Sequence, residues 1–174
     1  MKKIFFILSF LPVFAFAQTT WHTVSSDVSF KIKNGGIPVK GSLEGLKTEL
    51  KFSPEKLGTS HIKGSVEVAT IKTGINKRDK DLKGEKFFDA DKYKIIEISS
   101  NKLYKKDAQY AGTFKVTMKG VTKEMEIPFT FTQNGKEADF QSSFTLNRRD
   151  FGVGGKTLTM SDEVHVSIDI KAKE

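Results

Sequence analysis

The chain has 174 residues, a formal net charge of +8, 15 Phe, one Trp and no Cys. This length predicts a single domain, and hydrophobic residues at 37% beside charged residues at 29% are typical of a soluble globular protein. The absence of Cys excludes disulfide frameworks, thiolate zinc sites, iron–sulfur clusters and cysteine nucleophiles.

Residues 1–17 have the pattern of a secretory signal peptide. The segment begins Met-Lys-Lys, continues as an apolar run, and ends Ala-Phe-Ala, which places small residues where signal peptidase recognises them. A membrane anchor would need about 20 apolar residues, more than this run supplies. We therefore predict cleavage near Ala17–Gln18, a mature domain of residues 18–174, and a periplasmic or secreted location. Loss of the two signal lysines lowers the net charge from +8 to +6.

After the signal, apolar residues recur at every second position, which is the period of β-strands. Between residues 39 and 52 the apolar residues change from odd-numbered to even-numbered positions near Gly45, which predicts a bulge or a bend there. Residues 73–89 do not alternate; spacings of three and four there predict a short helix that ends near Gly84. The sequence thus predicts eight strands, at residues 28–32, 39–52, 62–68, 96–100, 110–118, 125–131, 138–146 and 164–170.

Eight strands with one apolar face bury that face most simply by closing into an antiparallel barrel, so we predict an all-β fold with one short helical insertion. An outer-membrane barrel also alternates, but it needs aromatic girdles, and this chain has one Trp and three Tyr. Many lysines occupy the opposite face of the strands, which we therefore place outside, with Phe inside.

The sequence gives little support for catalysis or for a nucleic-acid partner. Its three His have no metal-ligand spacing, and alternation directs His61 and His165 to solvent. Phosphate loops, nucleophile elbows and dinucleotide fingerprints are absent. The positive charge is spread along the strands, which is compatible with transient contact with a membrane surface but is not typical of nucleic-acid binding.

Two groups of charged residues differ from the solvated faces: Arg78-Asp79 in the predicted helix, and Arg148-Arg149-Asp150 after a strand. An arginine beside a carboxylate either fixes a loop by hydrogen bonds or holds a polar head group at a cavity mouth. We favour the structural role for Arg78, Asp79, Arg148 and Asp150, and keep them as candidate contacts at the mouth.

An eight-stranded barrel is either filled by its own side chains or encloses one small ligand. Small residues such as Gly112 alternate with large ones on the inward face, which leaves both interpretations open. Along a strand, either the odd-numbered or the even-numbered residues face inward, and we call this property strand parity. It selects ten candidate wall residues for an apolar tunnel: Val28, Phe30, Ile32, Val66, Phe114, Val116, Phe129, Phe131, Phe140 and Phe144.

Four segments carry a family resemblance that spans residues 21–173. In chain order they are Ser26-Asp27-Val28-Ser29-Phe30; Thr73-Gly74 with Arg78-Asp79, Leu82 and Phe87-Phe88-Asp89; Gly112 with Lys119-Gly120-Val121-Thr122-Lys123 and Pro128; and Asn147-Arg148 with Asp150-Phe151-Gly152-Val153 and Asp162-Glu163-Val164. The chain resembles the YceI-like family of polyisoprenoid-binding, lipocalin-like periplasmic proteins. This chain has Ser25 at a position where members of that family often have His. Any contribution of that His to holding the head group of a ligand is therefore not expected in this chain.

The resemblance implies a lipocalin-like barrel around a long apolar tunnel, with a helical insertion near its mouth. It implies a non-catalytic protein that binds a polyisoprenoid or an isoprenoid quinone for transport, storage or sequestration, with no cofactor other than that lipid and no metal. A homodimer is compatible with it. Two alternatives stay open: an enzyme that acts on such a lipid through a polar centre at the mouth, and a ligand-free stress or surface module.

Overall fold

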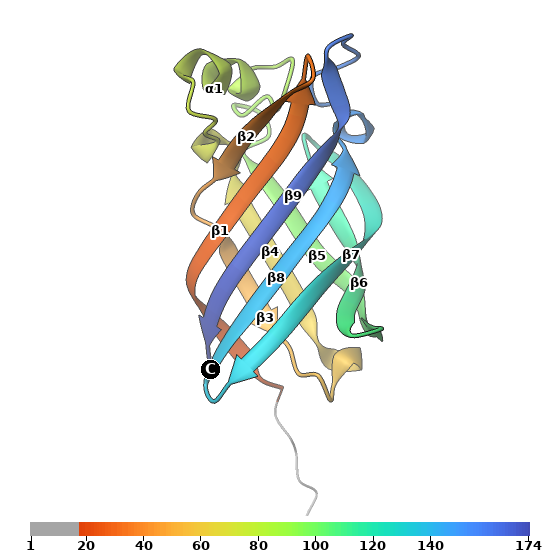
Figure 1. Ribbon diagram of the computed structural model, residues 1–174. Helices are drawn as coiled ribbons and strands as arrows, with labels where there is room; N and C mark the ends of the chain where they lie inside the picture. Colours follow the sequence, from red (N-terminus) through yellow and green to blue (C-terminus); the bar gives the residue numbers. More distant parts are fainter. Residues whose placement is uncertain (1–17) are drawn as a thin grey trace, which may run out of the picture.

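The computed structural model describes residues 18–174. The signal peptide expected in residues 1–17 lies outside the described residues, so its cleavage stays a prediction. In the described part the chain forms one sheet that curls until its two sides meet, with one helix at one end (Figure 1).

The sheet has the order β2-β1-β3-β4-β5-β6-β7-β8-β9, and all its pairings are antiparallel. The strands are β1 (Thr20–Asn34), β2 (Ile37–Leu43), β3 (Lys47–Lys51), β4 (His61–Glu67), β5 (Ile95–Lys106), β6 (Gln109–Met118), β7 (Val121–Asn134), β8 (Glu137–Asn147) and β9 (Met160–Lys173). The helices are α1 (Asn76–Lys83) and the 3-10 turns η1 (Leu57–Thr59), η2 (Val68–Thr70) and η3 (Arg148–Phe151).

β2 and β3 are the two halves of one interrupted strand, because both pair antiparallel with the same side of β1. Gly45 lies between them with φ +73°, a conformation that only Gly adopts without strain. The barrel therefore has the eight strand positions that the sequence predicts, and the bend expected near Gly45 is confirmed. The predicted helix is also confirmed, with Gly84 as the residue that follows it.

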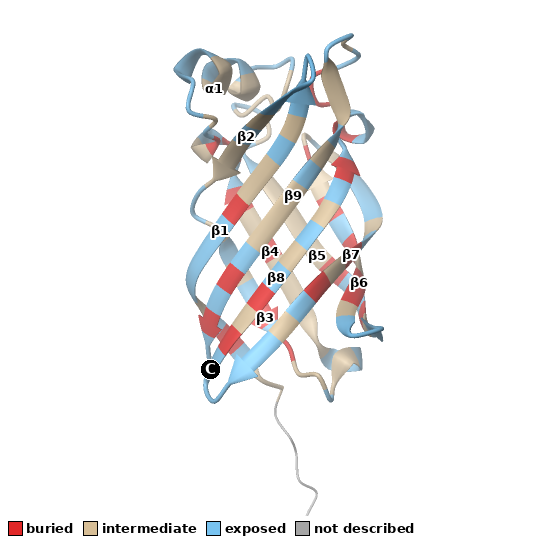
Figure 2. Ribbon diagram, in the orientation of Figure 1, coloured by how far each residue is buried: buried red, intermediate tan, exposed pale blue. Residues whose placement is uncertain are grey.

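The barrel closes through β1 and β9, which pair along almost their whole length from His22 to Asn34. A register shift between Thr23 and Ser25 makes Val24 a bulge residue. The bulge shifts the inward phase by one residue, which explains why both Trp21 and Val28 are buried although one number is odd and the other even. Away from the register shifts, which also occur between Ile32 and Asn34 and between Ser100 and Lys102, buried and exposed residues alternate along most of the strands as the sequence predicts (Figure 2).

The two ends of the barrel differ. The base, where the C-terminus lies, is filled by aromatic rings: Phe52 is fully buried, and its ring centroid lies 4.8–5.7 Å from those of four other aromatic side chains, Tyr110, Phe129, Phe131 and Phe140. The indole N–H of Trp21 donates to the carbonyl of Phe52 at 2.9 Å. The opposite end, called the mouth below, carries the β1–β2 hairpin, the insertion of residues 72–94 with α1, and residues 152–159 (Figure 1).

Replacing Phe52 by Ala tests how far the base depends on this aromatic cluster. Loss of a fully buried ring in a close-packed site should lower the free energy of unfolding by about 3–5 kcal/mol, measured by urea denaturation. Leu158→Ala removes a fully exposed side chain and should change it by less than about 0.5 kcal/mol. Equal effects of the two substitutions would show that the cluster does not stabilise the barrel.

Candidate functional site: an apolar tunnel

The interior of the barrel holds three apolar cavities. The mouth cavity has a volume of about 130 Å³, the middle cavity about 80 Å³ and the base cavity about 60 Å³. The wall surface that faces each cavity is apolar. Each volume exceeds what one water molecule needs, about 10–15 Å³, but none of the three offers water the two to four polar partners that would hold it.

The cavities follow one another along the barrel, because neighbouring cavities share walls. Met118, Leu146 and Val166 line both the mouth and the middle cavity. Gly64 and Phe144 line both the middle and the base cavity, as do Leu46, Ile98 and Ile168. We call the three together the tunnel; it runs from the mouth to the aromatic cluster at the base.

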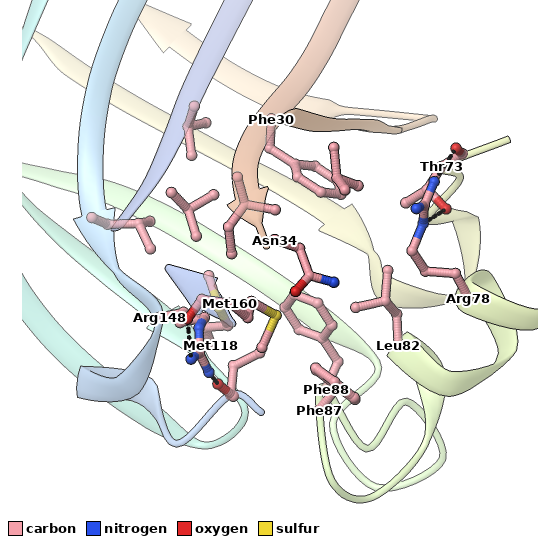
Figure 3. A pocket seen from close by; sticks show the side chains of 16 residues that line it. Phe30, Asn34, Thr73, Arg78, Leu82, Phe87, Phe88, Met118, Arg148 and Met160 are labelled. Carbon is pink, nitrogen blue, oxygen red and sulfur yellow. Dashed lines mark hydrogen bonds between the residues drawn. The ribbon is translucent and has the colours of Figure 1, made fainter. Parts of the chain in front are cut away.

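Side chains from both sides of the barrel form the mouth cavity (Figure 3). β1 supplies Phe30 and Asn34, and the insertion supplies Leu82 and the two rings of Phe87 and Phe88. Across the cavity lie residues of β6, η3 and β9. The helical insertion therefore covers one side of the entrance with apolar side chains.

Nine of the ten wall residues that strand parity selects do line the tunnel. Phe30 and Ile32 lie on the mouth cavity; Val28, Val66 and Val116 on the middle cavity; Phe114, Phe129 and Phe140 on the base cavity; and Phe144 on the middle and base cavities. Phe131 differs. It lines none of the three, because its ring packs against Trp21, Phe52 and Phe140 and belongs to the closed base.

The tunnel also has walls that the candidate set omitted. Five of them occupy inward positions of predicted strands, so strand parity could have identified them from the sequence: Ile98, Met118, Leu146, Val166 and Ile168. Leu82, Phe87 and Phe88 lie in the non-alternating insertion, where parity has no meaning. Met160 precedes the alternating run of the last strand.

Arg78 and Asp79 converge on Thr73 in the insertion. The backbone N–H of Thr73 donates to Asp79 Oδ1 at 2.8 Å, and its hydroxyl donates to the same oxygen at 2.5 Å. Arg78 donates from Nε to Thr73 Oγ1 at 2.8 Å and from Nη2 to the Thr73 carbonyl at 2.9 Å (Figure 3). Arg78 lines the mouth cavity, and its Nη1 group makes no hydrogen bond to another described residue.

Arg148 is buried beside the mouth, and all five of its N–H donors are used within the protein. Nε donates to the Ser161 carbonyl at 2.8 Å, and Nη1 donates to the carbonyls of Val153 and Gly155 at 2.7 and 2.8 Å. Nη2 donates to the Met160 carbonyl and to Asp162 Oδ1. Burial lowers the pKa of the guanidinium, and the charge of Asp162 partly offsets this effect. Arg148 therefore fixes residues 153–162 around the entrance.

The four charged candidates do not form one polar centre. Asp150 is exposed in η3 and, like Asp79, lines none of the three cavities. Of the histidines, His22 and His165 are exposed, while His61 is half-buried with Nδ1 3.3 Å from Ser100 Oγ. Across residues 18–174, no three His, Asp or Glu side chains gather in a way that would hold a metal ion. None of the helices in that range is long and apolar enough to cross a membrane.

Comparisons with known proteins agree with the fold. The family model of the YceI-like domain matches residues 20–172. A UPF0312 protein of Pseudomonas savastanoi pv. phaseolicola is 30% identical over 138 residues, which cover 74% of this chain and 71% of that protein. The crystal structure of BcnA from Burkholderia cenocepacia superposes with a TM-score of 0.81 at 26% identity, covering 85% of this chain and 96% of BcnA.

A more distant structure shares the fold alone. It is a polyisoprenoid binding domain from Saccharophagus degradans, implicated in plant cell wall breakdown, with a TM-score of 0.68 at 11% identity. The superposition covers 88% of this chain and 97% of that domain.

The hydrogen bonds of Arg148 predict a large structural effect for its removal. Arg148→Met leaves four carbonyls without this donor and should lower the free energy of unfolding by about 2–4 kcal/mol in urea denaturation. Arg149→Met is the matched control: Arg149 is exposed, pairs with the other oxygen of Asp162, and should cost less than about 1 kcal/mol. An Arg148→Met protein as stable as Arg149→Met would contradict the structural role.

Proposed function

Because the chain belongs to the YceI-like domain family, we propose that its barrel is an exported, non-catalytic carrier for the tail of an isoprenoid lipid such as a quinone or a polyprenyl carrier. The observation that carries this proposal is the tunnel: three apolar cavities in line, open at one end and closed by aromatic rings at the other. A linear hydrocarbon chain is the ligand whose shape and polarity fit such a space.

The length of the tunnel sets the number of units it accommodates. Six residue steps along β9 separate Val164 on the mouth cavity from Ile170 on the base cavity. At about 3.3 Å per residue and a strand tilt of roughly 40°, this is about 15 Å along the barrel axis. An extended chain covers about 3.5 Å per three bonds, so on the order of 13 chain bonds fit, or about three five-carbon units.

The energetics favour occupation of the tunnel. The mouth cavity of about 130 Å³ has an apolar wall, so an apolar tail replaces water there favourably. Each buried five-carbon unit contributes on the order of 4 kcal/mol before the cost of ordering a flexible tail. Two or three units therefore suffice for stable binding.

The polar groups at the mouth support binding rather than reaction. Arg148 has no N–H left for a substrate, and Asp79 accepts both hydrogen bonds from Thr73. Arg78 keeps its Nη1 group for a head group that accepts hydrogen bonds. No Asp, Glu or His of the described residues lines any of the three cavities, and Lys63, which lines the base cavity, is paired with Glu97 at 3.3 Å.

Two further considerations support the proposal. The polyisoprenoid binding domain of Saccharophagus degradans has the same fold, which makes an isoprenoid the first ligand to test. The apolar run and the Ala-Phe-Ala sequence in residues 1–17 support export, which would bring the barrel to a compartment bounded by membranes.

Gly64 offers a direct test of the tunnel. It lines both the middle and the base cavity, and a Cβ there would lie 3.3 Å from the Cγ2 methyl of Ile98 and 3.4 Å from the Cδ1 methyl of Leu46. Gly64→Leu should therefore divide the tunnel without unfolding the barrel. Mass spectrometry of an organic extract should show isoprenoids on the unmodified protein, and about a tenfold or greater loss of lipids with tails longer than the upper part of the tunnel in the variant.

Gly58→Leu is the matched control, because a Cβ on Gly58 meets nothing within 4 Å and lies outside the tunnel. It should retain the same lipids as the unmodified protein. Recovery of no isoprenoid from folded, exported protein would contradict the proposed function. Identical lipid profiles for Gly64→Leu and Gly58→Leu would instead show that the bound lipid does not occupy the tunnel.

A further inference from the structure

The most exposed large aliphatic side chain of the described residues is Leu158, at 102%. Ile37 and Ile75 are also unusually exposed, at 69% and 51%. Single exposed aliphatic residues are common on protein surfaces and need no explanation. These three are different because of where they lie.

Each of the three is flanked by residues that line the mouth cavity. Ile37 lies between Asn34 and Val39 at the β1–β2 hairpin, and Leu158 between Val153 and Met160. Ile75 lies in the insertion, between Thr73 and Arg78. Three segments far apart in sequence thus each place one exposed aliphatic residue beside the same opening. We call Ile37, Ile75 and Leu158 the rim residues.

Hydrogen bonds join the segments that carry the rim residues to one another. The backbone N–H of Gly35 in the hairpin donates to the Thr159 carbonyl at 2.8 Å. β2 and the insertion are joined by two backbone hydrogen bonds between Ser42 and Lys72, at 2.8 and 3.0 Å. The rim is therefore a part of the folded barrel, held in place around the opening.

The rim is also basic. Lys33, Lys77, Lys80 and Lys156 are exposed on the same three segments. Two carboxylates lie near these lysines: Asp79, which accepts two hydrogen bonds from Thr73 and lies beside Arg78, and the exposed Asp81 of α1. Aliphatic residues interspersed with lysines match the chemistry of an anionic lipid surface, where head groups attract the lysines and the acyl boundary takes up the aliphatic side chains.

We propose that the rim docks on the surface of an anionic phospholipid bilayer, with the tunnel opening directed at the membrane. This inference rests on the proposed function, since docking in this orientation lets an isoprenoid tail pass from bilayer to tunnel without crossing water. Docking is peripheral and reversible: three aliphatic side chains and a few lysines bind a bilayer surface far more weakly than a spanning segment does.

A bilayer fits the rim better than a second protein chain does. The rim residues stand on separate segments around an opening, whereas stable protein interfaces need a continuous, well-packed patch of about 800 Å² on each partner. A protein seated there would also cover the tunnel and block the ligand. Neither difficulty arises with a fluid lipid surface.

Co-sedimentation of the mature protein with vesicles tests the proposal. The unmodified protein should bind vesicles of phosphatidylcholine mixed with phosphatidylglycerol, and binding should weaken as salt is raised and on vesicles of phosphatidylcholine alone. The combined variant Ile37→Ser, Ile75→Ser and Leu158→Ser should lose about 100-fold in vesicle affinity. Ser is a favoured N-cap residue, which suits the position of Ile75 before α1, so the variant should stay folded.

Val24→Ser is the matched control. Val24 is 61% exposed, but it is the bulge residue in the half of β1 nearer the base, away from the mouth. It should bind vesicles as the unmodified protein does. Equal losses in Val24→Ser and the rim variant, or no vesicle binding at all by a protein that still retains its lipid, would overturn the docking proposal. Failure of lipid retention itself would overturn the proposed function instead.

Size-exclusion chromatography of the same proteins supplies the remaining outcome. A rim variant with the same elution volume as the unmodified protein supports docking on lipid. If the unmodified protein is a dimer and the rim variant a monomer, the rim is a contact between two copies of the chain, and the bilayer proposal is wrong.

Discussion

The antiparallel pairing of β1 with β9 closes the sheet into a cylinder, and the rest of the structure depends on this closure. In a closed barrel, successive residues of a strand point alternately inward and outward, so one set of side chains shares a single interior. Here that set mixes Phe, Val and Ile with Gly64 and Gly112. Large residues fill the base, and smaller ones leave three neighbouring cavities above it. The tunnel is therefore a consequence of which residue sizes occupy the inward positions.

The two ends of the barrel are stabilised in different ways. At the base, aromatic rings pack against one another, and the indole N–H of Trp21 is the side-chain donor that the cluster satisfies internally, on the Phe52 carbonyl. The mouth is built from loops, whose backbone carbonyls need donors. Arg148 supplies five N–H groups to one such loop, and Arg78 and Asp79 fix another through Thr73. Hydrogen bonds thus hold the entrance in shape, while the wall of the mouth cavity stays apolar.

Alternation in the sequence was sufficient to predict the strands, the bend at Gly45 and most of the tunnel wall, because strand parity depends on neighbouring residues alone. Bulges limited it: the phase changes at Val24 and again between Ser100 and Lys102, and a register shift is defined only by the pairing with another strand. Parity also treated Phe129 and Phe131 alike, although only the first faces the tunnel. The carbonyl partners of Arg148 depend on loop conformation, which leaves no pattern in the sequence.

The proposed function requires that a single apolar tail occupies the whole tunnel. A crystal structure of the protein purified from its native compartment, without detergent, tests this most directly. We predict continuous electron density from the side of Arg78 through all three cavities, ending at the ring of Phe140. Side chains that close the space between Met118 and Phe144, with no density between them, would contradict the claim and show that the barrel interior is a packed core.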